Sequence, residues 1–551
     1  MKLAKKQALF LTLLATCAGF AVGCGSEPEA SETSKEQSNS QATSGQSSAQ
    51  TSEEKITPVE PTTPVTIKWW NNYKVPSNPD DESTRSGSTY REYWYARDLI
   101  AEFSKAHPNI TVETSYKGSY SDIVTATSTA LGTGDQPNIV SCYGDSVAVF
   151  RNASEDAILD MTGYAQNLVE DTDFNQNYLS IEKSMYGGRF YSLPYSKSAE
   201  TLVVNQSMFD KVGAGKAGTD TIKGEAAVYT APVAAASKKA YTIPENIYGL
   251  MDLARTMKTD FPELFADQKD ENGFFKAVPF CWDSAENMFI SALKNSGIDY
   301  TDGTKENAVD RVLFKNDDAK KLMVQMKKWN NEGLFCTRSQ LPITDAAKGD
   351  HQYSSNMVVA GSIAMCVSST AGARYFATDG GFKASFYHPV SWKENGQAKD
   401  ANVISQGPSL CFFDKGKEAN DASFIFYQYL TNATNSGALA AATSYFPLRA
   451  KGYENETIAA AVTAATTGTT AEALYKEKNT TYTGNVLALN TTYTENNNYF
   501  LSPVFSESSA TRTAVGKLVA EVFDNQKVTT DAEIEAAVNT AFDNAYNSIM
   551  A

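Results

Sequence analysis

The sequence predicts an α/β fold of two lobes, and two observations carry that prediction. Residues 65–145 alternate between strand-like and helix-like patterns, an order typical of a parallel sheet covered by helices. Residues 188–205 then combine aromatic and β-branched residues with interleaved polar ones, and they end in the apolar run 201–204. That mixture is typical of a strand that crosses between two lobes, with one side packed and the other facing a cleft. An ordinary core strand before a helix at Met208 is the alternative.

The first part of the chain contains three expected strands and two expected helices. Alternating apolar residues mark the strands, and apolar residues three and four positions apart mark the helices. In chain order these elements are expected at 65–69, 96–103, 110–112, 123–131 and 137–145. The first helix should end before Pro108, because a proline disfavours the helical conformation of the residue that precedes it. Ligands of such a sheet lie beyond the C-terminal ends of its strands.

Aromatic and polar side chains follow the first and third of these strands. Trp70-Asn-Asn-Tyr-Lys74 follows the first strand, and Tyr143-Gly-Asp145 follows the third. Sugars have apolar C–H faces that stack on aromatic rings, and hydroxyl groups that hydrogen-bond to carboxylate, amide and ammonium groups. A small-ligand cleft needs an apolar wall with a few placed polar groups. Core packing is the alternative for each aromatic residue taken alone, but two strand tips of this kind favour a ligand site.

Later segments extend the same scheme. A strand with a polar tip is expected at 277–283, an apolar strand at 360–367, crossing segments at 403–413 and 445–449, and terminal helices at 511–523 and 531–549. Three segments rich in polar or small residues interrupt the pattern and are interpreted as insertions: 75–90, 213–243 and 454–497.

Length and charge narrow the class of partner. A chain of 551 residues has room for two or more domains with a large core. The formal net charge is −16, and residues 1–23 hold three lysines and no acid, so the remainder carries −16 − 3 = −19. This acidic balance argues against nucleic acid or an anionic membrane surface as a partner. It favours neutral or cationic ligands.

The N-terminus is typical of a secreted bacterial lipoprotein. Three lysines precede a mostly apolar run at 8–22, which is shorter than a membrane span. The run ends in Ala21-Val-Gly-Cys24, which resembles a lipobox, so cleavage before Cys24 and lipid modification of this cysteine are expected. A plain secretory signal with a chance cysteine is the alternative. Residues 25–64 are rich in Ser, Glu, Gln, Thr and Pro, which predicts a disordered tether of roughly 35 Å.

Motifs for metals, cofactors or catalysis are missing or incomplete. The cysteines beyond Cys24 are far apart and form no C-x-x-C, which predicts buried thiols and leaves one disulfide open. The G-x-G-x-x-G at 213–218 follows no strand, so a dinucleotide site is not expected. Gly144-Asp145-Ser146 follows a strand as in some esterases, but none of the three histidines has an aspartate three residues before it. No cofactor or metal is therefore expected, but the motifs do not exclude paired-carboxylate glycosidase chemistry, because 64 acidic residues always offer pairs.

The order of these segments resembles the extracellular solute-binding proteins of family 1, the sugar-capturing components of ABC importers. The resemblance is carried by the opening 65–145, the crossing with Leu193-Pro194-Tyr195 and Asn205, the strand at 360–372 and the crossing at 445–449. It covers about 65–551 apart from the insertions, and it rests on order and spacing rather than on one motif. Family members often carry an aromatic residue where this chain has Ser368, Ser369 and Thr370, so that wall of the site departs from the pattern.

The resemblance implies a maltose-binding-protein-like, two-lobed periplasmic-binding-protein fold, with a mainly parallel sheet in each lobe and hinge crossings between them. Lobe 1 would comprise 65–195 and 408–446, and lobe 2 would comprise 196–407 and 447–551. The implied ligand-binding residues lie at strand ends facing the cleft: Trp70, Asn72, Tyr73, Lys74, Tyr143, Asp145, Tyr195, Glu200, Phe280, Trp282, Asp283, Ser369 and Thr370. Replacing Trp70 or Trp282 by alanine is expected to abolish binding while the fold survives.

The implied function is capture of a carbohydrate, an oligosaccharide above all, and its delivery to the transmembrane subunits of an ABC permease. The protein would be a monomer on the outer face of the bacterial cytoplasmic membrane, held only by its lipid anchor. An enzyme acting on surface polysaccharide and an adhesin or structural lipoprotein are the alternatives from other classes.

Overall fold

The computed structural model describes residues 54–551 apart from 87, 211–217, 224–227, 234–240, 347–348, 377–381, 457, 460–497, 526 and 551. The expected signal segment, Cys24 and most of the expected tether lie outside the described residues. So do most of the G-x-G-x-x-G segment and most of the insertion at 454–497.

The first lobe is built on a five-stranded sheet in the order β2-β1-β3-β15-β4. Its strands are β1 (Val65–Asn71), β2 (Ile110–Tyr116), β3 (Ile139–Cys142), β4 (Ser192–Pro194) and β15 (Ser409–Phe412). Its helices are α1 (Arg91–Ala106), α2 (Tyr120–Thr133), α3 (Gly144–Ala153), α4 (Thr162–Val169), α5 (Gln176–Met185), α13 (Lys417–Leu430) and α14 (Ala433–Thr443). The strand and helix positions predicted for 65–142 are confirmed.

The second lobe is built on a sheet in the order β16-β14-β5-β12-β8-β9, with β13 also paired to β5. Its strands are β5 (Ser198–Asn205), β8 (Val278–Trp282), β9 (Phe335–Thr337), β12 (Ile363–Ser369), β13 (Ala384–Tyr387), β14 (Val403–Gln406) and β16 (Tyr499–Phe500). Two small hairpins are β6 (Gly218–Lys223) with β7 (Val228–Val233), and β10 (Ile343–Asp345) with β11 (Asp350–His351).

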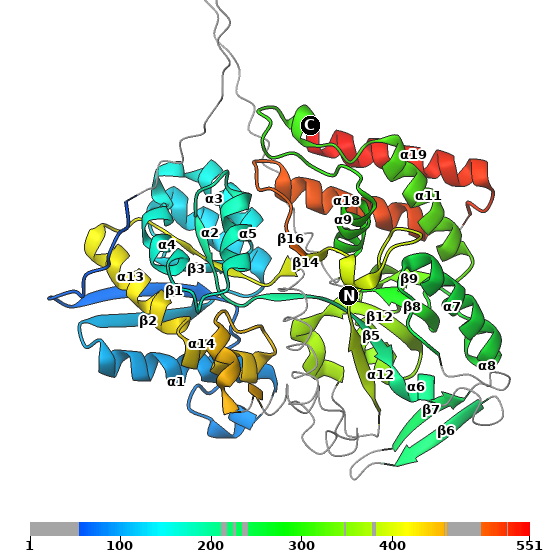
Figure 1. Cartoon of the computed structure of the whole chain (residues 1–551), viewed down its shortest axis with the longest axis horizontal. Coiled ribbons are helices and arrows are strands. Elements are labelled where there is room, and N and C mark those ends of the chain that lie inside the picture. Colours follow the sequence, from blue (N-terminus) through cyan, green and yellow to red (C-terminus); the bar gives the residue numbers. More distant parts are fainter. Residues whose placement is uncertain are drawn as a thin grey trace, which may run out of the picture. The chain divides into compact units, whose positions relative to one another are not determined.

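The helices of the second lobe are α6 (Gln206–Asp210), α7 (Ile247–Asp260), α8 (Pro262–Phe265), α9 (Ala285–Ser296), α10 (Ala308–Arg311), α11 (Asp317–Asn331), α12 (Ser354–Val359), α18 (Ser508–Asp524) and α19 (Asp531–Met550). The two terminal helices pack on each other and on α9 and α11 (Figure 1). Their buried residues, such as Val515, Leu518 and Phe542, join the apolar core of this lobe.

Both sheets are mixed, which differs from the mainly parallel sheets that were expected. β1, β2 and β3 are parallel to one another, whereas β15 is antiparallel to its neighbours β3 and β4. In the second lobe β5 is antiparallel to β12, β13 and β14. The antiparallel strands result from the crossings. Most strands of each sheet run toward the cleft. A chain that crosses from one sheet to the other enters the second sheet from the cleft, and its strand therefore runs in the opposite direction.

Three crossing segments meet between the sheets. The Ser196 N–H donates to Pro408 O at 3.1 Å, and the Phe446 N–H donates to Lys197 O at 2.7 Å. Gly407 has φ +86°, and a Cβ on it would lie 1.8 Å from Ser196 O. Glycine is required there because two crossings touch backbone to backbone in a left-handed conformation.

Residues 54–64 lie in contact with the first lobe, whereas a disordered tether was expected to extend to residue 64. The Ile56 N–H donates to Gly163 O at 3.0 Å, and the Val59 N–H donates to Asp421 Oδ2 at 3.1 Å. A Cβ on Gly163 would lie 2.7 Å from the Ile56 side chain, so the glycine makes room for it. The prediction of disorder was based on the polar composition of the whole segment, which does not indicate contacts made by single residues such as Ile56 and Val59.

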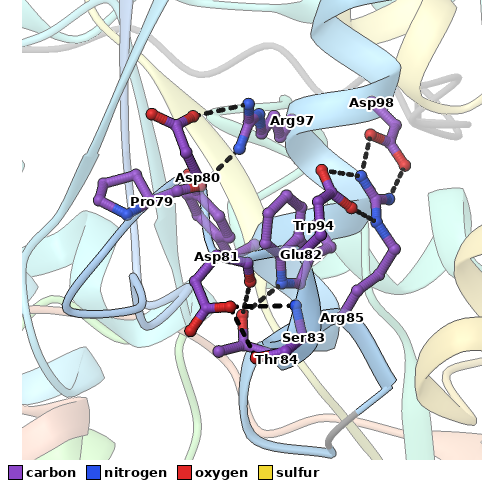
Figure 2. Close-up of polar contacts among 11 residues, drawn as sticks. Pro79, Asp80, Asp81, Glu82, Ser83, Thr84, Arg85, Trp94, Arg97 and Asp98 are labelled. Carbon is purple, nitrogen blue, oxygen red and sulfur yellow. Dashed lines mark hydrogen bonds and ion pairs between the residues drawn. The ribbon is translucent and has the colours of Figure 1, made fainter.

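The segment around 79–85 packs on the outer side of α1 (Figure 2). Trp94 of α1 is buried, with the guanidinium carbons of Arg85 and Arg97 at 4.4 and 5.0 Å from its ring. Arg97 pairs with Asp80 at 3.0 Å, and Arg85 pairs with Asp98. Part of the insertion at 75–90 is thus fixed to the first lobe by cation–π contacts and ion pairs.

Within the described ranges, no helix has the length and apolar character that crossing a membrane requires. The five cysteines among those residues are buried free thiols: Cys142, Cys281, Cys336, Cys366 and Cys411.

Candidate functional site

A cavity of about 450 Å³ lies where the crossings and both sheets meet, and we call it the first cavity. The first lobe contributes Tyr143, Asp145 and Met185, and the crossings contribute Lys197, Gln406 and Tyr445. The second lobe contributes the start of α9, the end of β12, the segment 501–505 and the first half of α18. Small-molecule sites are concave and commonly measure ~300–1,000 Å³. The cavity is therefore large enough for a small ligand that touches both lobes.

Aromatic side chains from four separate segments line the first cavity: Tyr143, Tyr300, Tyr445 and Phe505. Tyr143 is 42% exposed, and its ring centroid lies 4.7 Å from that of Tyr120. Burial raises the pKa of the Tyr445 hydroxyl above its usual value, so this group is a neutral donor. These rings can stack on an apolar ligand face while their hydroxyls hydrogen-bond.

Two helices that directly follow strands begin at the first cavity, one from each lobe. α3 begins directly after Tyr143, and the Ser284 hydroxyl caps α9 by accepting the Asn287 N–H at 3.1 Å. The first turns of these helices carry Asp145 and Glu286, respectively, and both line the cavity. A helix start after a cleft-facing strand thus places a carboxylate at the cavity, near the positive end of the helix dipole.

Arg512 of α18 is the cation nearest these acids. Its guanidinium donates to Asn287 Oδ1 and lies 3.6 Å from Glu286 Oε1. Burial raises the pKa of the Asp145 carboxyl, and the positive charge of Arg512 works against that rise. Lys197 also lines the cavity, but its ammonium group pairs with buried Glu182 at 2.8 Å. Asp145 and Glu286 therefore face Arg512 as the lining cation that is not already paired with buried Glu182.

Glu200 lies buried behind the cavity wall. It is 3% exposed, and the Trp282 indole N–H donates to its Oε1 at 3.1 Å. Burial raises the pKa of this carboxyl to about 7, against opposing hydrogen bonds from Trp282 and Asn287. Asn287 itself lines the cavity, so Glu200 is in contact with a wall residue.

The predicted site residues fall into three groups. Tyr143, Asp145 and Ser369 line the first cavity. A second group is buried in the cores and does not line it: Tyr73, Tyr195, Glu200, Phe280, Trp282 and Thr370. The remaining residues are partly or fully exposed elsewhere: Trp70, Asn72, Lys74 and Asp283.

Trp282 is buried because both faces of its strand are covered: all five residues of β8 are buried. Phe280 and Trp282 are two residues apart on β8 and therefore share a face, and Trp282 packs against Trp392 at 5.8 Å between ring centroids. At 1% exposed, Trp282 is a core residue in this structure, so its replacement by alanine is expected to destabilise the lobe itself. Trp70 has the Lys117 ammonium 4.1 Å from its ring centroid, away from the cavity.

Several cavity residues were absent from the sequence prediction. Lys197 and Tyr445 stand in crossing segments that the sequence identified, so their position was an available signal. Asn287 and Glu286 stand in the first helical turn after a cleft-facing strand, and that position was a second available signal. Arg512 and Phe505 come from a late return of the chain to the cleft, for which local sequence pattern offers no signal.

Two sheets, three crossings and a cavity lined from both sides define a two-lobed ligand-binding protein. The family model described as bacterial extracellular solute-binding protein matches residues 98–466, and the chain belongs to that family. The family and the structural neighbours are binding proteins and not enzymes. A search of curated protein sequences finds no match.

Solved structures share the fold at low sequence identity. The cyclic α-maltosyl-1,6-maltose binding protein of Arthrobacter globiformis is 12% identical, with TM-score 0.56 over 87% of this chain and 100% of that one. Lmo0181 of Listeria monocytogenes, solved with cycloalternan, is 14% identical, with TM-score 0.56 over 88% and 99%. UgpB of Mycobacterium tuberculosis, solved with glycerophosphocholine, is 14% identical, with TM-score 0.56 over 88% and 98%. These likenesses confirm the predicted two-lobed α/β fold.

Proposed function

We propose that this protein captures a carbohydrate in the first cavity and delivers it to the permease of an ABC importer. The observation that carries the proposal is the lining of that cavity, where tyrosine and phenylalanine rings alternate with carboxylate, amide and hydroxyl groups from both lobes. Such a lining matches the alternating apolar faces and hydroxyl edges of a sugar. Sugar-binding proteins among the structural neighbours support the same ligand class.

The mechanism is closure of two lobes around the ligand. Asp145 and Tyr143 belong to the first lobe, whereas Asn287 and Ser369 belong to the second. A ligand that bonds to both sets stabilises the closed state through contacts that the open state lacks. The three crossings supply the hinge, and no covalent bond changes.

The lipid anchor at Cys24 remains part of the proposal. A basic start, an apolar run and small residues before Cys24 support it. A tethered capture protein stays near its permease. Mass spectrometry of the membrane fraction from cells that express the full chain tests it, because a diacylglyceryl modification adds a defined mass to the Cys24 peptide. Release of wild-type protein into the medium without that modification would contradict it.

A thermal-shift screen against neutral mono- and oligosaccharides, polyols and short peptides tests the capture function. A ligand at a hundred times its dissociation constant adds about 2.7 kcal/mol of stability, which gives a measurable rise in melting temperature. Tyr445→Ala should remove the response to the ligand that wild-type protein binds. Tyr387→Ala is the matched control, because Tyr387 is 37% exposed and lies outside the cavity. No response from folded wild-type protein to any sugar would favour an adhesin.

A further inference from the structure

Strand β5 carries a carboxyl group at the boundary between the first cavity and the core of the second lobe. Ser198, Glu200 and Leu202 are two residues apart along the strand and therefore share one of its faces. Ser198 lines the first cavity, whereas Leu202 belongs to the apolar core of the second lobe. Glu200 lies between them, buried, and it does not line the cavity. Its carboxyl group therefore acts on the cavity wall through neighbouring side chains.

Asn287 of α9 is the side chain that joins Glu200 to the cavity. Its amide N–H donates to the Glu200 carboxylate, and its Oδ1 accepts from the Arg512 guanidinium. A carboxylate only accepts hydrogen bonds and a guanidinium only donates them, so a single orientation of the amide satisfies both neighbours. The opposite orientation would place the amide NH2 against the guanidinium and the amide oxygen against the carboxylate. Asn287 and Arg512 both line the first cavity.

The position of Arg512 matters to both lobes. Its guanidinium lies 3.6 Å from Glu286 Oε1, and its positive charge acts on Asp145 of the first lobe, where it opposes the rise in the pKa of that carboxyl. Without the Asn287 oxygen, these two acids alone would attract the guanidinium, and Arg512 would move along the cavity wall. The Asn287 amide thus fixes a cation that faces the ligand.

We propose that Glu200 is a positioning residue for capture: its carboxylate holds the Asn287 amide in the orientation that keeps Arg512 in place on the cavity wall. Glu200 itself does not touch the ligand. Protonation adds a donor to the carboxyl group and removes the requirement for that orientation, so capture should weaken as Glu200 becomes neutral. This inference rests on the proposed function, because it assigns a positioning role within the same site.

The Glu200 carboxyl changes its charge in the neutral pH range, because burial raises its pKa to about 7. The charged groups that act on it are Arg512 of α18, which favours the ionised form, and Glu286 of α9, which disfavours it. Trp282 of β8 and Ser369 of β12 also lie beside it, and neither carries a charge. Affinity should therefore rise with pH as Glu200 loses its proton.

Isothermal titration calorimetry of the purified chain at pH 5.5 and pH 8.5 tests the proposal. The probes are maltotriose, cellotriose, xylotriose and mannotriose, with any further neutral sugar that the thermal-shift screen identifies. Wild-type protein should bind its sugar about tenfold more tightly at pH 8.5, the change that a shift of one pKa unit on binding produces. Glu200→Gln should bind about tenfold more weakly than wild type at pH 8.5 and equally at both pH values.

Asp260→Asn is the matched control, because this carboxyl group is also buried in the second lobe, accepts from the Tyr241 hydroxyl at 2.7 Å and lies outside the first cavity. It should leave affinity and its pH dependence unchanged. In protein that carries Asn287→Ala, Glu200→Gln should change affinity by less than about twofold, because the link to the wall is already absent.

Three results would overturn this inference and leave the proposed function standing. They are wild-type affinity in Glu200→Gln, an equal loss from Glu200→Gln with and without Asn287→Ala, and a pH dependence that persists in Glu200→Gln. The last result would assign the titration to Asp145. Binding of no sugar, here or in the thermal-shift screen, would overturn the proposed function and this inference together.

Discussion

Two regions of this protein use the same ionic chemistry in opposite surroundings. At the hinge, the Lys197 ammonium pairs with Glu182 at 2.8 Å, and the two side chains are 4% and 0% exposed. On the outer side of α1, Arg85 pairs with Asp98, and these side chains are 40% and 57% exposed (Figure 2). Water screens an exposed pair and can replace either partner, whereas it has little access to the buried pair, of which Lys197 alone borders the first cavity.

The buried pair also takes part in hydrogen bonds with neighbouring serine hydroxyls. Glu182 accepts from the hydroxyls of Ser409 and Ser192, and the Lys197 ammonium donates to Ser409 Oγ at 2.6 Å. Ser192 precedes one crossing, Lys197 stands in it, and Ser409 follows another. The network therefore fixes two crossings relative to α5. The comparison indicates that an ion pair stabilises the hinge when its two charged groups are buried and cannot be solvated by water instead.

The largest expected effect is at the hinge. Lys197→Met leaves the Glu182 carboxylate buried without its cation, and the free energy of unfolding should fall by about 3–5 kcal/mol. Urea unfolding followed by tryptophan fluorescence measures this change. The double variant Lys197→Met with Glu182→Leu should recover most of the loss, because it leaves no buried charge. A loss below 1 kcal/mol in the single variant would show that water reaches the hinge, and the contrast with the surface would be lost.

Glu200 gives the next effect, which depends on pH. Its pKa is about 7 in the folded protein and 4.5 when unperturbed, so the folded state holds the proton more tightly. Its contribution to stability is full below pH 4.5 and is lost as pH rises to about 7. Glu200→Gln should therefore raise the free energy of unfolding at pH 8, by on the order of 3 kcal/mol, and leave it unchanged at pH 4. Parallel urea curves at the two pH values measure it; an equal change at both would contradict it.

A third ion pair joins the lobes, and its exposure lies between that of the Lys197–Glu182 pair and that of the Arg85–Asp98 pair. Arg374, which follows β12, pairs with Glu92 of α1 at 3.0 Å, and the side chains are 11% and 19% exposed. A pair that spans the cleft exists only while the lobes are close. Arg374→Gln should therefore weaken ligand binding several-fold and increase the radius of gyration of the unliganded protein in solution scattering. Weaker binding with an unchanged radius would mean that the pair acts within the bound state alone.

The sequence predicted the strands, the crossings and part of the site for local reasons. Alternation in 65–69 marked β1, where Ile67 and Trp69 are buried, and the polar residues within 188–205 marked a crossing. The same local reasoning assigned Phe280 and Trp282 to the cleft, whereas both faces of β8 are covered and both rings lie in the core of the second lobe. The partnership of Glu182 with Lys197 joins two segments whose pairing no periodicity indicates. Arg512 reaches the cavity from a helix near the end of the chain.

The smallest expected effect is on the outer side of α1. Asp98→Asn removes one partner of Arg85, but Arg85 keeps its contacts with Glu82 and with the face of Trp94. The melting temperature should therefore move by no more than about 1 °C, and 0.5 M salt should abolish even that difference. Trp94→Ala is the comparison variant: it leaves a cavity in place of a buried ring and should lower the melting temperature clearly. If Asp98→Asn were as damaging as Lys197→Met, exposure would not decide the strength of ion pairs in this protein.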